Sequence, residues 1–162
     1  MSNQLQSGTL LEIVKNDIVF PGTDEVRDAD ELFKRGPVNA SMIISSTGED
    51  WEDNFSGMKV GPQPSSTVST RLLLETSRDT TILSQLGGEE AAELSLAEFS
   101  FLLGNIGKET FLAYIRNKEG IMVCALAHLD FWKWNLHCEY LGDPDPRING
   151  YLIATRNSRV NP

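Results

Sequence analysis

Cysteine and histidine are scarce in this chain, which has two of each among its 162 residues. So few cysteines exclude the disulfide-dense scaffolds that stabilise many small secreted domains. The sequence also lacks the C-x-x-C and H-E-x-x-H spacings that are typical of zinc sites. Glycine-rich phosphate-binding motifs are missing as well, so no pattern indicates a nucleotide. We therefore expect no metal and no cofactor.

Basic residues are also few: 14 Lys and Arg stand against 23 Asp and Glu, which gives a net charge of −9. A nucleic-acid-binding surface needs clustered positive charge, so we expect no nucleic-acid partner. The acidic excess lies mainly in residues 1–57, which carry 11 acidic and 4 basic residues. This acidic third either meets a basic partner protein or only keeps the protein soluble.

Long apolar runs are missing too. No segment approaches the roughly 20 apolar residues that a membrane-spanning helix needs. The N-terminal residues lack the basic stretch and apolar core of a signal peptide. These absences predict a cytoplasmic protein with reduced thiols and no membrane partner. The length fits a single domain over residues 1–162.

The patterns that are present predict an α+β fold whose first two thirds are mainly helical, with a few strands. Short strands are predicted at residues 42–44 and 67–75, while residues 9–18 fit either a helix or a strand. Ser95 and Glu98 have the spacing of a capping box at the start of the last helix. The predicted helices cover residues 23–35, 79–86, 89–94 and 96–103.

Residues 45–66 are rich in Gly, Ser, Pro and acidic residues, and they predict one long loop. Trp51 and Phe55 lie among the charges of this segment. One interpretation is a mobile surface loop with an aromatic side chain in the core. The other is an acidic and aromatic recognition segment, in which Trp51 and Phe55 bind a partner.

The last third predicts a four-stranded antiparallel meander packed on the helix at residues 96–103. Its strands cover residues 110–116, 121–129, 134–141 and 151–155. Because side chains alternate along a strand, the register of the second hairpin decides which residues share a face. Placing Leu129 opposite Trp134 makes one face entirely apolar, which removes the most apolar surface from water. The same register puts Cys124 and Cys138 on opposite faces, so no disulfide joins them.

This register brings His128 and His137 together on the second face, with Cys124 and Glu139 beside them. These four residues are the candidates for a metal site or a hydrolytic site. Zinc needs three or four ligands that converge on one point, and neighbouring side chains on a flat sheet rarely do so. The alternative, which we favour, is that both histidines are ordinary half-exposed strand residues.

Phe131, Trp132 and Lys133 fall at the tip of the predicted hairpin. Either this tip folds back on the chain or it is exposed, and exposed aromatic residues are enriched at binding hot spots. We therefore predict a small acidic protein without enzymatic activity that binds another protein, as a regulator, inhibitor or accessory subunit. The alternatives are an enzyme that uses the histidine face, and a structural subunit that self-assembles through exposed strand edges.

Overall fold

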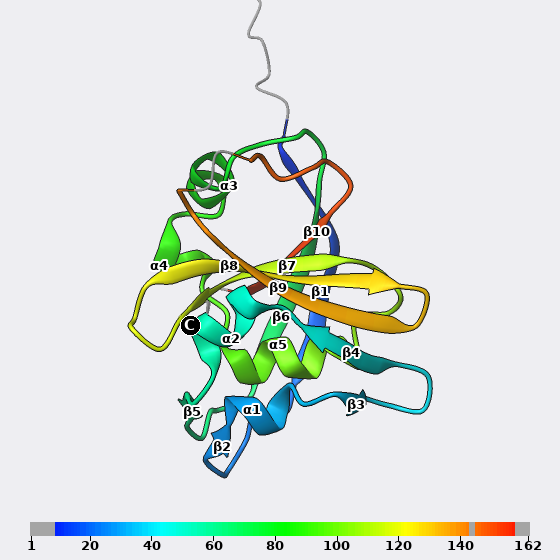
Figure 1. Ribbon diagram of the computed structural model, residues 1–162. Coiled ribbons are helices and arrows are strands. Elements are labelled where there is room, and N and C mark those ends of the chain that lie inside the picture. The colour runs from blue at the N-terminus through cyan, green and yellow to red at the C-terminus, as the bar shows by residue number, and fades with distance from the viewer. Residues whose placement is uncertain (1–8, 143–144, 158–162) are drawn as a thin grey trace, which may run out of the picture.

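The computed structural model describes residues 9–142 and 145–157, and its central element is a mixed sheet of eight strands (Figure 1). Neighbouring strands pair antiparallel, except for two parallel pairs that are named below. Across the sheet the strands run in the order β1 (Leu11–Phe20), β6 (Ser66–Leu73), β10 (Leu152–Arg156), β7 (Phe111–Arg116), β8 (Met122–Asp130), β9 (Lys133–Tyr140), β4 (Ile43–Thr47) and β3 (Gly36–Pro37).

Five short helices accompany the sheet within the described residues, and the longest has eight residues. They are α1 (Ala29–Leu32), α2 (Glu49–Phe55), α3 (Asp79–Gln85), α4 (Glu89–Ala92) and α5 (Leu96–Leu103). The first two thirds of the chain supply four strands of the large sheet as well as these helices. The predicted α+β fold with a helical N-terminal two thirds is therefore wrong, and the structure is mostly β.

The N-terminal segment, which fitted either a helix or a strand, forms β1 at one end of the sheet. Its pairing with β6 has two register irregularities between Ile13 and Ile18. Such bulges interrupt the two-residue alternation by which a strand is recognised in a sequence. Most residues of β1 are also exposed, so their polarity gives no clear burial pattern.

The helix predicted over residues 23–35 is reduced to the four residues of α1. Arg27–Asp28 forms β2, which pairs antiparallel with β5 (Lys59–Val60) in a separate two-stranded sheet. Asp30 accepts hydrogen bonds from Ser56 Oγ and from the Gly57 backbone N–H, both at 2.9 Å. These partners lie 26 and 27 residues away in sequence, so local helix propensity cannot reveal them.

The segment at residues 45–66 is not one continuous loop, since it contains α2 and β5. Helix α2 follows β4 directly, and the Gly48 N–H at its N-cap donates to the Leu136 carbonyl oxygen of β9 at 2.9 Å. Its first turn carries three acidic residues, which suits the positive end of a helix dipole. The acidic composition therefore reflects a helix start rather than a loop.

The predicted meander is confirmed for three of its four strands, because β7, β8 and β9 pair antiparallel in sequence order. The fourth is wrong: β10 lies between β6 and β7 and runs parallel to β7. The register of the second hairpin is confirmed, with Leu129 opposite Trp134 and Ala125 opposite Cys138. The other parallel pair joins β4 to β9.

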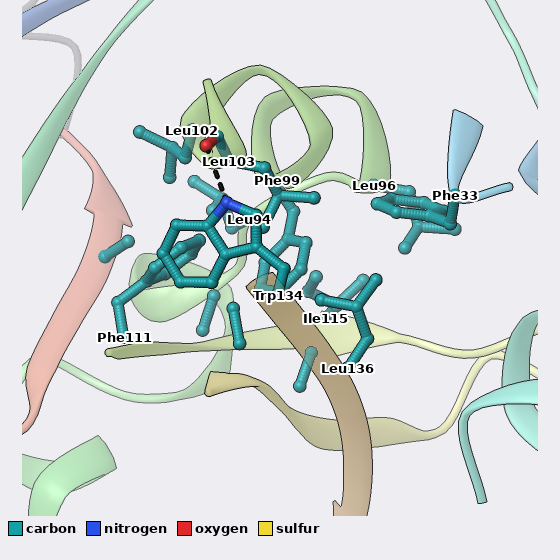
Figure 2. Close-up of a cluster of buried hydrophobic side chains, with 14 of the residues drawn as sticks. Phe33, Leu94, Leu96, Phe99, Leu102, Leu103, Phe111, Ile115, Trp134 and Leu136 are labelled. Atoms are coloured by element: carbon teal, nitrogen blue, oxygen red, sulfur yellow. Dashed lines mark hydrogen bonds between the residues drawn. The ribbon is translucent and has the colours of Figure 1, made fainter. Parts of the chain in front are cut away.

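Both faces of the sheet are covered, and each has its own apolar core. Helices α1, α2 and α5 lie on one side of the sheet, and α3 lies on the other (Figure 1). On the first side, the buried Trp134 indole donates a hydrogen bond of 2.9 Å to the Leu103 carbonyl oxygen at the end of α5 (Figure 2). The capping box of α5 is confirmed, with Ser95 and Glu98 each satisfying the other's backbone N–H.

Candidate binding surface at the hairpin tip

The turn between β8 and β9 consists of two aromatic residues, Phe131 and Trp132. The Phe131 side chain is 80% exposed and Trp132 is 56% exposed, while Lys133 beside them is exposed as well. The two rings lie 5.9 Å apart, centroid to centroid, so they contact each other rather than the core. The alternative in which the tip folds back on the chain is therefore not what the structure shows.

Phe131 has a backbone φ of +59°, and it is the one non-glycine residue with positive φ among those described. A two-residue turn with positive φ only at its first position has the pattern of a type II′ turn. Glycine normally occupies that position, because a side chain there crowds the backbone. Phe131 thus places a bulky aromatic side chain at a turn position where glycine is normally favoured, although glycine is common elsewhere in this chain.

Strand β4 holds the tip on one side. The Ile43 N–H donates to the Trp132 carbonyl oxygen at 3.1 Å, and the parallel pairing of β4 with β9 begins opposite Lys133. On the other side, the Leu129 N–H donates to Thr110 Oγ1 at 3.1 Å. The turn is thus tied to two neighbouring segments while both of its aromatic side chains face solvent.

Trp51 and Phe55, the other two aromatic residues predicted to bind a partner, are 3% and 1% exposed. Their ring centroids lie 4.7 Å apart, and Trp51 also contacts Phe33 and Phe99 at 5.0 and 5.5 Å. Helix α2 turns both residues toward the core because they are four positions apart on one helical face. The structure therefore places them in the interior, away from the tip.

The four candidates for a metal or hydrolytic site are brought to one face but not to one point. His128 and His137 are exposed, whereas Cys124 is 1% exposed. Glu139 forms an ion pair with Arg147. Within residues 9–142 and 145–157, no group of three or more His, Cys, Asp or Glu side chains could hold a metal ion.

The two thiols lie in different cores, Cys138 on the α5 side of the sheet and Cys124 on the other, and both are free. Burial raises the pKa of Cys138 to about 12, and burial also raises the pKa of Cys124, although Arg147 opposes this. A nucleophilic cysteine needs a lowered pKa and access to substrate. Neither thiol meets these conditions.

A buried charge cluster on the face opposite α5 escaped the sequence analysis. Arg147 is 5% exposed and binds Asp79 with two hydrogen bonds, Nε to Oδ1 at 2.9 Å and Nη2 to Oδ2 at 2.7 Å. Tyr114 also donates to Asp79, at 2.7 Å. Arg147 and Asp79 are 68 residues apart in sequence. The sequence around Arg147 indicated only a tight turn, and the sequence around Asp79 indicated only the start of a helix. This cluster satisfies its own polar groups and therefore suits a structural role.

The surface hollows are small. A cavity of about 230 Å³ lies beside α5, lined by Phe20, Leu32, Val60 and Phe101 among others. Pockets that enclose a small molecule usually measure roughly 300–1,000 Å³. The exposed aromatic tip is therefore a stronger candidate for recognition than this hollow.

Comparisons with protein-family models, with curated proteins and with solved structures found no match to this chain. Of the helices in the described residues, none has the length and apolar character that crossing a membrane requires.

Proposed function

We propose that this protein is a binding module that contacts another protein through the tip of the β8–β9 hairpin. The observation that carries the proposal is Phe131, an 80% exposed aromatic residue with left-handed backbone geometry. A large aromatic side chain stabilises a fold when it is buried. The Phe131 side chain is mostly exposed, and its positive φ adds backbone strain. Strain that does not serve the fold is typical of functional sites.

The tip has the properties of a preformed anchor. Its two rings contact each other, and hydrogen bonds to Ile43 and Thr110 hold the backbone on either side. A rigid aromatic pair loses little conformational entropy when a partner covers it, so more of the burial free energy becomes affinity. Asp130 and Lys133 lie opposite each other at the base of the turn, so the charge there is balanced. Recognition would rest on an apolar pocket in the partner.

Affinity capture from cells that naturally produce the protein tests this proposal. The wild-type protein is compared with a Phe131→Gly, Trp132→Ala double variant, which removes both rings and leaves the turn compatible with its backbone. Hot-spot aromatic residues contribute about 2 kcal/mol or more, so we expect at least about 30-fold weaker binding of the captured protein.

The matched control is Ile121→Ala. Ile121 is 48% exposed and lies at the β7–β8 turn, so its removal deletes exposed apolar surface elsewhere on the same ribbon. The control should capture the same protein as the wild type. Equal capture by the tip variant and the control would show that the tip is not the binding surface.

A further inference from the structure

A small hollow lies between α1 and α2, on the same side of the sheet as α5 (Figure 1). Its volume is about 220 Å³, which suits a molecule of about one ring rather than a drug-sized ligand. Its apolar wall consists of four buried residues, Ala29, Phe33, Trp51 and Phe55. The Trp51 ring contacts both of the other rings, with centroids 5.0 Å from Phe33 and 4.7 Å from Phe55. The hollow therefore offers an aromatic wall to a ligand.

The indole N–H of Trp51 has no hydrogen-bond acceptor within residues 9–142 and 145–157, although Trp51 is only 3% exposed. In those same residues every fully buried side-chain N or O atom has a partner, so this N–H reaches solvent, and it does so at the hollow that Trp51 lines. Trp134, which is also buried, instead donates its N–H to the Leu103 carbonyl oxygen. Buried tryptophans usually pair this donor. The unpaired N–H therefore indicates a ligand that carries an acceptor.

The charged residues that line the hollow differ in whether they already have partners. Asp30 and Glu52 accept hydrogen bonds from neighbouring hydroxyl groups, at 2.9 and 3.2 Å. Lys34 forms an ion pair with Glu31 at 3.4 Å. The Arg35 guanidinium has neither a hydrogen bond nor an ion pair in the described part of the chain. The groups of the hollow that lack a partner are thus two donors, the indole N–H and this guanidinium.

We propose that this hollow binds a small aromatic carboxylate. The ring of the ligand packs against the aromatic wall, and its carboxylate accepts hydrogen bonds from Trp51 Nε1 and from the Arg35 guanidinium. A planar guanidinium presents its donors in a fork that matches a carboxylate. A neutral ring of the same size leaves Arg35 without a counter-charge. A cationic ring finds no unpaired acid, because both lining acids already accept hydrogen bonds.

This site is separate from the hairpin tip. None of the lining residues belongs to the β8–β9 turn, and Trp51 and Phe55 line the hollow from within the core rather than from an exposed surface. An apolar wall with a few placed polar groups is the usual composition of a small-molecule site. The carboxylate site therefore stands or falls independently of the protein partner proposed above.

The indole N–H resonance of Trp51 in a ¹H–¹⁵N spectrum of the full chain tests the proposal, with benzoate as the probe. A hydrogen bond to the carboxylate should move this resonance downfield until the site is saturated. The resonances of Trp132 at the tip and of Trp134, whose N–H is already bonded, should stay in place as internal references. Benzyl alcohol and benzylamine carry the same ring with a neutral or a positive group. Both should bind at least about tenfold more weakly than benzoate.

Arg35→Gln removes the unpaired charge and should raise the dissociation constant of benzoate about tenfold in the same titration. Arg27→Gln is the matched control, because Arg27 is also an exposed arginine whose guanidinium has no partner in the described residues, but it does not line this hollow. The control should bind benzoate as the wild type does. A Trp51 resonance that stays in place at millimolar benzoate, equal binding of benzyl alcohol, or equal weakening by the two arginine changes would each overturn the proposal.

Discussion

At the scale of single residues, the side chains divide into those that stabilise the fold and those that do not. Trp134 is buried and satisfies its indole N–H at the end of α5, so its identity follows from packing. Arg147 is buried with Asp79, and hydrogen bonding to Asp79 raises its pKa although burial opposes this, so the guanidinium stays charged. Phe131 has neither burial nor a polar partner to explain its position.

Replacing Phe131 with glycine tests whether the Phe131 side chain stabilises the fold. Glycine tolerates positive φ, so Phe131→Gly should leave the free energy of unfolding unchanged or raise it by about 1 kcal/mol. Denaturant unfolding monitored by circular dichroism measures this, with Ile121→Ala as the control. A loss of more than about 2 kcal/mol, the size expected for a buried aromatic residue, would show that Phe131 belongs to the core.

At the scale of elements, α5 shows how a cap connects to the sheet. Glu98 completes the capping box by accepting from the Ser95 N–H at 3.1 Å, and it also accepts from Ser66 Oγ at 2.7 Å. Its carboxylate forms an ion pair with Arg156 of β10 as well. Burial alone would raise the pKa of Glu98, but the hydrogen bonds from Arg156, Ser66 and Ser95 outweigh burial and lower it. The cap therefore fixes both the start of the helix and its position against β6 and β10.

This arrangement makes stability depend on pH. Because the pKa of Glu98 is lower in the folded protein than its ordinary value of 4.5, the folded state is favoured above pH 4.5 and the gain disappears as pH falls through the lowered pKa. Glu98→Gln should cost about 1–2 kcal/mol near neutral pH, since Arg156 is partly exposed, and its unfolding free energy should approach that of the wild type in acid.

Unfolding free energies measured from acid to neutral pH test this dependence on Glu98. Glu90→Gln, at an exposed glutamate in α4, serves as the control and should stay within about 0.5 kcal/mol of the wild type throughout. A Glu98→Gln deficit that is the same at every pH would contradict the assigned role of the carboxylate.

At the scale of the whole molecule, one eight-stranded sheet carries an apolar core on each face and the aromatic tip at one of its turns. The hairpin tip belongs to β8 and β9, while β1 lies at one end of the sheet, beyond β7, β10 and β6.

The sequence predicted what depends on local pattern. The register of Leu129 opposite Trp134 followed from alternating apolar residues, and the cap of α5 followed from the spacing of Ser95 and Glu98. The placement of β10 beside β7, and the meeting of Arg147 with Asp79, depend on contacts between distant segments. Register irregularities interrupt the side-chain alternation of β1, so its sequence fitted either a helix or a strand. Pairing with β6, a distant segment, determines that it is a strand.

At the candidate site, too, the sequence revealed what depends on local pattern and missed what depends on three-dimensional packing. The hairpin register predicted which residues lie at the turn, but it left open whether their side chains fold back on the chain or are exposed. Trp51 and Phe55 were predicted to bind because their neighbours are charged, and the structure buries them through the helical geometry of α2. Charge in the surrounding sequence did not indicate exposure, since one helix presents acidic residues outward and aromatic residues inward.

The central claim is that the aromatic tip meets another protein, and photo-crosslinking from the tip tests it most directly. A photoreactive phenylalanine analogue is introduced at Phe131 in producing cells, and at Ile121 for comparison. The account predicts a covalent adduct with a distinct protein from position 131 and none from position 121. No adduct at position 131, or the same adducts from both positions, would contradict it.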